Sequence, residues 1–186
     1  RYNFAGVDEA ANMLCKCPEG VIQILSKVED LPFLMDNQFH LTFSRNLLKH
    51  CHEPERAIES MYKKTRKGGV CVCAESIVLK EEDKAIPNAL LRMTDSTHPP
   101  VLSLDDIREK FERAGFSHIE YSIFPYRSAW LSRWLAAEQG TGRTREDALA
   151  LYRSAPKAFL ERQQVEIHDD EITSTVPWAL VRAVKD

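Results

Sequence analysis

Two acidic side chains stand where strand-like segments end, and both could contact a bound ligand. Asp8 follows the apolar segment 2–7, and Glu75 follows the apolar segment 70–74. Open α/β sheets bind ligands at the carboxyl ends of their parallel strands, and a carboxylate there can accept hydrogen bonds from two neighbouring hydroxyl groups at once. Each residue could instead have a purely structural role. Asp8 also suits the N-terminus of a helix, and Glu75 can be a carboxylate at the sheet edge whose hydrogen bonds are made within the protein.

His50 is a candidate for acid-base chemistry, because imidazole changes its charge near neutral pH. It follows the polar loop 44–46, which comes after a third strand-like segment, 41–44. A histidine there could act as a base or orient a substrate. Its neighbours Lys49 and His52 leave a polar surface cluster as the alternative.

The five cysteines do not indicate a metal site. Cys71 and Cys73 alternate along a strand-like segment and share one face, with no third ligand at zinc-like spacing and no C-x-x-C anywhere. Free cysteine packs as a small apolar residue, so we predict no metal. The odd number of cysteines and the absence of an Asn-x-Ser/Thr acceptor favour a reducing, cytoplasmic location.

Length and composition predict one domain over residues 1–186, because 186 residues that are 44% apolar can bury a sizeable core. The net charge of -3 is spread without long blocks of like charge, so no nucleic-acid partner is predicted. No apolar run approaches the roughly 18 residues that a membrane-spanning helix needs. A small molecule or another protein is the expected partner.

Strand-like segments alternate with amphipathic helices, which predicts an α/β sheet covered on both faces. One helix begins at Pro54 and ends before Gly68. Another begins at Ser103, which has the capping-box spacing to Asp106, and ends at Gly115. The predicted strands are 2–7, 21–27, 41–44, 70–74, 116–124 and 175–184, and the predicted helices are 10–17, 54–67, 87–93 and 103–115.

A helical insert is predicted over residues 128–164, before the last strand. It divides at the sequence 140–142, Gly-Thr-Gly, and we expect Thr144 and Asp147 to cap its second half. Trp130 and Trp134 lie four residues apart and therefore share one helix face. Such a stripe is more often core than binding surface.

The stretch 29–75 resembles the middle of a class I S-adenosylmethionine-dependent methyltransferase of the type 11 small-molecule family. In that family an LPF turn leads through an "FD" step into a buried strand, then a helix opened by proline, then a Gly-Gly turn. These parts occur here in the same order, as Leu31-Pro32-Phe33, Phe39-His40, the segment 41–44, Pro54 and Gly68-Gly69.

The resemblance implies a Rossmann-like sheet with strand order 3-2-1-4-5-7-6, in which the strands of this sequence are the second to the seventh. The first strand and its glycine-rich loop are absent from the sequence. We therefore expect a missing N-terminal segment, or a homodimer or partner chain that supplies the central strand. In this family an insert at the position that residues 128–164 occupy here forms a lid over the acceptor pocket.

The resemblance also implies a site for the methyl donor S-adenosylmethionine. Lys27 stands where the family usually has an acid, and lysine cannot accept a hydrogen bond, so the adenine contact would pass to Glu29 or the backbone. Alternatively, Lys27 is only a solvated charge. The expected donor contacts are Asp8, Glu9, Met13, Lys27, Val28, Glu29, Ser44, Arg45 and Asn46. The catalytic candidates are His50 and Glu75, and the expected acceptor-pocket residues are Tyr126, Arg127, Trp130 and Trp178.

The function expected from this resemblance is methyl transfer to a small molecule by direct displacement at the donor's sulfonium. Such a reaction needs alignment more than acid-base help. The alternative is a methyltransferase-like regulatory subunit that a partner chain completes. A nicotinamide dehydrogenase is excluded because the sequence has neither G-x-G-x-x-G nor Tyr-x-x-x-Lys.

Overall fold

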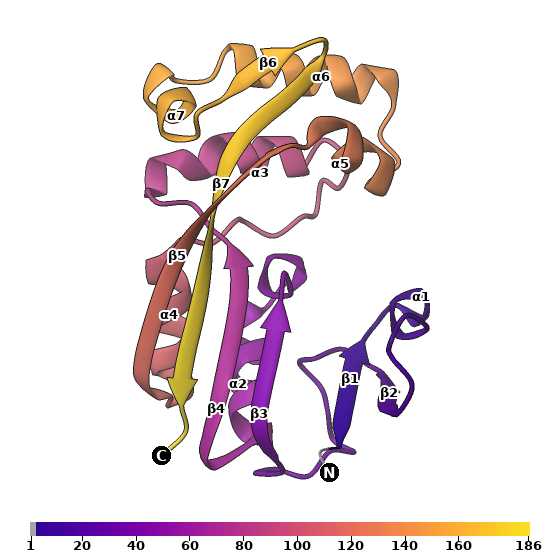
Figure 1. The fold of residues 1–186 in the computed structure, drawn as a ribbon, viewed down its shortest axis with the longest axis vertical. Helices are drawn as coiled ribbons and strands as arrows, with labels where there is room; N and C mark the ends of the chain where they lie inside the picture. The colour runs from indigo at the N-terminus through magenta and orange to yellow at the C-terminus, as the bar shows by residue number, and fades with distance from the viewer. Residues whose placement is uncertain (1–2) are drawn as a thin grey trace.

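Two β-sheets make up the strand layer of the computed structural model, which describes residues 3–186 (Figure 1). The smaller sheet is a parallel pair, and the larger has the order β3-β4-β7-β5 with the short β6 on β7. The first predicted strand began at Tyr2, which lies outside the described residues. The strands are β1 (Phe4–Asp8), β2 (Val21–Leu25), β3 (Phe39–Arg45), β4 (Thr65–Ser76), β5 (Ser117–Ala129), β6 (Glu166–His168) and β7 (Glu171–Val184).

The predicted α/β class is confirmed, and within each sheet the neighbouring strands are those of the predicted order. β3 runs parallel to β4, whereas β7 runs antiparallel to both β4 and β5. The described residues form two sheets, as expected when the central strand of that order is missing between them. β1 and β3 are the strands that would flank the absent first strand, so neither has a neighbour on that side.

Two helices cover the same face of the larger sheet (Figure 1). They are α2 (Pro54–Lys64) and α4 (Leu104–Ala114). Phe111 of α4 is fully buried and packs in one cluster with Cys71 and Cys73 of β4, so these cysteines serve as core residues. The prediction of helices on both faces is wrong for the larger sheet as described, because its face opposite α2 and α4 is exposed. The four-residue α1 (Ala11–Leu14) packs against β1 and β2 of the smaller sheet instead.

The ends of these two helices test the predicted capping signals. The capping box of Ser103 and Asp106 is present, and Gly115 closes α4 with a left-handed φ of 99°. In contrast, α2 ends at Lys64 rather than before Gly68. The reason is local, since Thr65 is already extended and its hydroxyl donates to the Met61 carbonyl at 2.7 Å.

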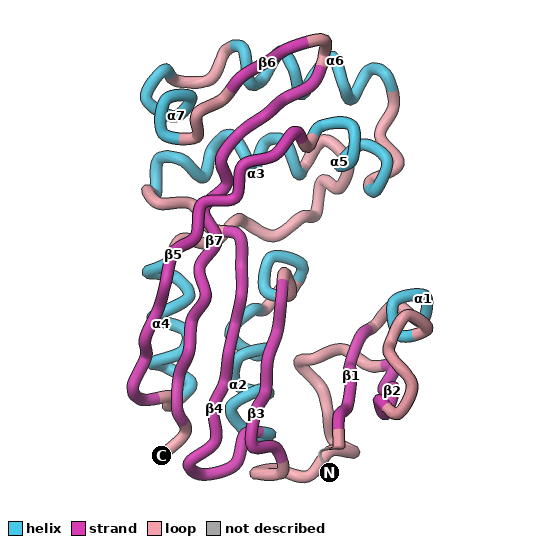
Figure 2. Tube along the Cα trace, in the orientation of Figure 1, coloured by secondary structure: helices cyan, strands magenta, loops and turns pink. Residues whose placement is uncertain are grey.

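A second hydrophobic core lies beyond the carboxyl ends of β3 and β4 (Figure 2). The helices around it are α3 (Ala85–Leu91), α5 (Leu131–Ala137), α6 (Gly142–Arg153) and α7 (Lys157–Arg162). The last three occupy the predicted insert, and we call the four together the helical cap. Thr141, paired with Thr144, caps α6, so the predicted capping pair of Thr144 and Asp147 is wrong. The cause is that α6 begins one turn earlier, at Gly142.

The face of the larger sheet opposite α2 and α4 exposes apolar side chains. Phe43 is 69% exposed, Leu41 52%, Phe124 53% and Leu180 38%. Together with the unpaired edges of β1 and β3, this surface favours association. We therefore expect a protein of residues 1–186 alone to lack a cooperative thermal transition, measured by calorimetry, and to self-associate in sedimentation runs. A sharp, reversible melt of a monomer would contradict this expectation.

Candidate functional site

The parallel pairing of β3 and β4 brings their carboxyl ends to one edge of the larger sheet. Ser44 lies opposite Cys73 in the register, and Arg45 lies opposite Ala74. Beyond the strand, the Asn46 amide donates to the Ala74 carbonyl at 2.9 Å, which extends the pairing by one residue. Side chains that follow both strands therefore meet at this edge, as the sequence predicted.

Glu75 is buried at this edge, with only 1% of its surface exposed. Its Oε1 accepts hydrogen bonds from the backbone amides of Leu47, at 2.6 Å, and Leu48, at 2.9 Å. These amides begin the short 3-10 helix η1 (Leu48–His50), so the Glu75 carboxylate holds the segment that carries His50. Burial raises the pKa of Glu75, although the Leu48 and Leu47 amides oppose this change.

Three buried polar atoms at this edge have no hydrogen-bond partner among the described residues. They are Ser44 Oγ, Asn46 Oδ1 and Glu75 Oε2. Buried polar atoms are nearly always paired in folded proteins, with protein groups or with bound water. Three unpaired atoms at the ends of two neighbouring strands therefore mark a place for a polar ligand. We call this group the strand-edge site.

Aromatic and basic side chains border the strand-edge site. The Arg45 guanidinium lies 5.4 Å from the centre of the Trp178 ring, so β7 also contributes to this edge. Lys49, on η1, is largely covered, and burial lowers its pKa although Glu75 and Glu138 oppose the change. Trp178 is thus the one predicted acceptor-pocket residue that the structure brings beside a predicted donor residue.

His50 lies on η1 and remains accessible to solvent. Partial burial of its ring is nevertheless the largest cause that lowers its pKa, followed by the charges of Lys49 and His98. A lowered pKa means that the His50 ring is neutral at neutral pH, with one nitrogen able to accept a proton. The ring meets the ring of His98 edge to face, with 5.9 Å between their centres.

Asp8 lies at the end of β1, and its Oδ1 accepts a hydrogen bond from the Ala10 amide at 2.8 Å. This contact orders the turn that leads into α1, whose N-cap is Ala10, so Asp8 does not itself cap the helix and a role in donor binding stays a prediction. Glu9 and Met13 follow Asp8 in the sequence, and Met13 is 48% exposed.

The loop after β2 reaches the segment that carries His50. Burial, and then the carboxylate of Glu29, raise the pKa of the Cys51 thiol to about 12, with smaller contributions from Glu75 and Glu9. Val28 packs against the core of the larger sheet. The structure thus places Glu9 and Glu29 near η1. We find no contact that explains Lys27.

The other predicted acceptor residues make contacts with the helical cap. Arg127 donates to the Gln164 carbonyl at 2.6 Å and forms an ion pair with Glu166 at 2.7 Å. The Trp130 indole donates to Ser174 Oγ at 2.9 Å, and its ring centre lies 5.3 Å from that of Tyr152. These contacts favour the core alternative for Trp130. Tyr126 is 51% exposed.

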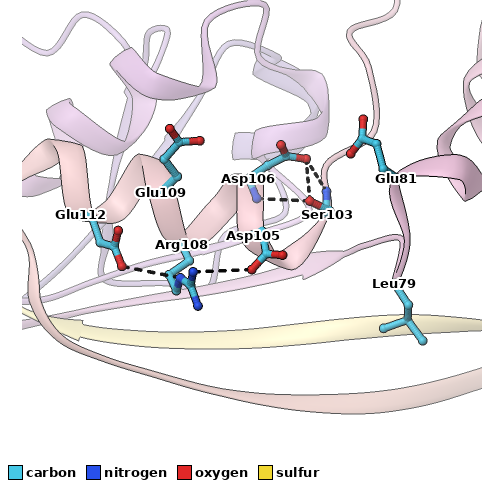
Figure 3. Close-up of a pocket in the computed structure, with 8 residues that line it drawn as sticks. All are labelled: Leu79, Glu81, Ser103, Asp105, Asp106, Arg108, Glu109 and Glu112. Carbon is cyan, nitrogen blue, oxygen red and sulfur yellow. Dashed lines mark hydrogen bonds and ion pairs between the residues drawn. The ribbon is translucent and has the colours of Figure 1, made fainter.

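Two surface hollows lie apart from the strand-edge site. The smaller has a volume of about 330 Å³ and lies beside α4, and Figure 3 shows Ser103 bonded to Asp106 and Arg108 paired with two acidic side chains in its wall. Its lining residues are Leu79, Glu81, Ser103, Asp105, Asp106, Arg108, Glu109 and Glu112. A second hollow, of about 580 Å³, lies between the segment 29–36 and α2, and Glu29 lines it. Neither hollow contains Ser44, Asn46 or Glu75.

Comparison with known proteins agrees with this arrangement. Residues 2–73 match the family model described as "Methyltransferase domain", which spans β1 to β4 up to Cys73. This first part of the chain is therefore similar to a methyltransferase domain. No curated protein matches the chain in sequence.

Solved structures show the same fold over nearly the whole chain. A putative methyltransferase from Bacillus halodurans C-125 has a TM-score of 0.86 at 18% identity, covering 97% of this chain and 82% of its own. The YcgJ protein of Bacillus subtilis has a TM-score of 0.86 at 16% identity, covering 97% and 81%. Phosphoethanolamine N-methyltransferase 2 of Haemonchus contortus, in complex with S-adenosyl-L-methionine, has a TM-score of 0.55 at 18% identity, covering 98% and 43%.

The predicted Rossmann-like fold is confirmed by these structures, and the family match over residues 2–73 agrees with the predicted methyltransferase family. No helix among residues 3–186 is long and apolar enough to cross a membrane. Sequence reasoning missed one residue near the site, His98. It lies in the loop 94–102, and its only sequence signal was its place directly before the pair Pro99-Pro100.

Proposed function

We propose that this methyltransferase transfers a methyl group from S-adenosylmethionine to a small molecule that binds at the strand-edge site. The observation that carries the proposal is the set of three buried, unpaired polar atoms on Ser44, Asn46 and Glu75. They lie beside the helical cap, and a cap that limits water access is a common way to complete such a site. The Haemonchus neighbour, a phosphoethanolamine N-methyltransferase, is consistent with a small acceptor.

The proposed reaction is an in-line displacement. A lone pair of the acceptor forms a bond to the methyl carbon while the carbon–sulfur bond breaks, and its electron pair goes to sulfur. S-adenosylmethionine supplies the methyl group already activated as a sulfonium, so holding both substrates in line provides much of the rate. In this chain Ser44 and Asn46 would hold polar groups of the substrates, and Glu75 would position η1.

Asp8 and the loop after β2 would hold the nucleoside part of the donor. Asp8 ends a parallel strand, and its carboxylate can accept hydrogen bonds from two adjacent ribose hydroxyls. Its bond to the Ala10 amide uses Oδ1, and a carboxylate oxygen can accept more than one hydrogen bond. Glu9, Met13, Lys27, Val28 and Glu29 are the further residues proposed for this part of the site, with Arg45 beside the methionine part.

We expect Asp8→Ala to weaken S-adenosylmethionine binding by about 1.5 to 3 kcal/mol, the range for a hydrogen bond to a charged group. Asp8→Asn is the matched control for structure, because its side-chain oxygen can still accept the hydrogen bond from the Ala10 amide. Calorimetry on both variants separates the roles, since loss of affinity in Asp8→Asn would reflect the carboxylate itself. Unchanged affinity in both variants would remove Asp8 from the donor site.

The function itself is tested by following S-adenosylhomocysteine release in the presence of small molecules with hydroxyl, amine or thiol groups. The proposal requires release that depends on the acceptor and that falls in Ser44→Ala and Asn46→Ala. If S-adenosylmethionine binds but no acceptor supports release, a regulatory role becomes the better account. The unpaired edges of β1 and β3 support that second candidate, because a partner chain could supply the strand between them.

A further inference from the structure

A second histidine reaches the strand-edge site from a distant part of the chain. The loop 94–102 joins α3 to α4, and Figure 2 shows it passing between the helical cap and the carboxyl ends of β3 and β4. Within this loop His98 places its ring against that of His50, with the ring planes 67° apart. Residues almost fifty positions apart therefore meet beside the strand ends.

The His98 ring is held in one orientation. Its Nδ1 lies 2.7 Å from the Pro99 carbonyl oxygen, and since a carbonyl only accepts, Nδ1 must carry the hydrogen. In a neutral imidazole the other nitrogen, Nε2, is then an acceptor. This Nε2 is buried and has no partner among the described residues. Its lone pair is therefore available to a donor that moves next to it.

One hydrogen bond ties the loop around His98 to the helical cap. The Val101 amide donates to Asn88 Oδ1 of α3 at 2.8 Å. Before the histidine, the backbone and hydroxyl of Thr97 both donate to Asp95 Oδ1, at 2.9 and 2.7 Å, which orders the turn within the loop. The His98 ring is thus held beside the cap, whereas the His50 side chain is exposed to solvent.

We propose that His98 is a positioning residue for His50, a role that rests on the proposed methyl transfer. Nε2 of His98 accepts the hydrogen of one His50 nitrogen, and this selects the tautomer whose other nitrogen faces the acceptor. No hydrogen bond joins the two rings in this structure, but such bonds often tighten only when substrate binds. A base oriented by a third group is a recurrent catalytic arrangement.

The arrangement also narrows the class of acceptor. His50 takes the proton of the acceptor atom as that atom's lone pair bonds to the methyl carbon, and sulfur receives the pair of the broken carbon–sulfur bond. The imidazolium then releases its proton to water. A base is useful only where the nucleophilic atom carries a proton that must be removed, so we infer a hydroxyl or amine acceptor rather than a thioether or tertiary amine.

The test is the tautomer of His50, read from its ring nitrogen shifts by NMR in the complete protein with S-adenosylhomocysteine added. We expect one tautomer in the wild type and a mixture of two in His98→Ala. His98→Asn should restore a single tautomer, because its amide oxygen can accept the same hydrogen. His52→Ala removes a nearby exposed histidine and should leave the wild-type pattern unchanged.

Two tautomers in the wild type, or one in a folded His98→Ala, would overturn the proposal. If His98→Ala does not fold, the wild-type spectrum and His98→Asn still decide it. Once an acceptor is found, His98→Ala should lower kcat about 10- to 100-fold, as loss of an orienting partner does elsewhere, with the KM for S-adenosylmethionine unchanged. Calorimetry with S-adenosylhomocysteine measures binding at the donor site independently of His98. Failure to bind would count against the proposed methyl transfer, whereas the tautomer result counts only for or against the role of His98.

Discussion

Glu75→Ala is expected to lower the free energy of unfolding by about 2 to 6 kcal/mol. The buried carboxylate accepts from the Leu47 and Leu48 amides, and each would lose its acceptor at a cost of about 1 to 3 kcal/mol. The loss should also loosen η1, which carries His50, so methyl transfer should fall with stability. Urea denaturation of the complete, folded protein measures the first effect.

Glu75→Gln is the matched control, since its amide oxygen can still accept from both backbone groups. It also tests the raised pKa of Glu75. An acid whose pKa is raised on folding gives less stability as pH increases from its ordinary value of 4.5 through its native value. The glutamine variant should therefore gain stability relative to the wild type as the pH rises above 4.5. Equal stability of the alanine and glutamine variants would contradict the capping role.

Trp130→Ala is expected to lower the free energy of unfolding by about 3 kcal/mol. This is the lower end of the usual range for removing a core aromatic ring, because Trp130 is only half-buried. The variant loses the contact with Tyr152 and the hydrogen bond to Ser174. Melting temperature and the binding constants of both substrates should be measured on the same variant.

Tyr126→Ala provides the control, because this aromatic residue lies on β5 with 51% of its surface exposed. Its stability should stay within about 0.5 kcal/mol of the wild type. A Trp130→Ala protein with normal stability and a much higher KM for the acceptor alone would return Trp130 to the acceptor pocket, where the sequence first suggested it.

Local signals in the sequence were reliable where neighbouring residues alone determine the structure. Pro54 began α2, and the capping box of Ser103 and Asp106 began α4, because both signals act within one helical turn. The alternation of Cys71 and Cys73 correctly placed both on the buried face of β4. The end of α2 was predicted three residues too late, because the bond from the Thr65 hydroxyl to the Met61 carbonyl can form inside a helix as well as at its end.

The sequence by itself predicted the α/β class and the position of acidic and polar residues at strand ends, and its resemblance to a family predicted the order of strands within each sheet. The first two predictions succeeded because strand spacing and terminal residues are local, and parallel strands bring their carboxyl ends to one edge. Only the tertiary structure decided the partners across that edge. It paired Glu75 with the η1 amides and brought His98 to His50, contacts that depend on how far-apart segments pack and leave no pattern in either segment alone.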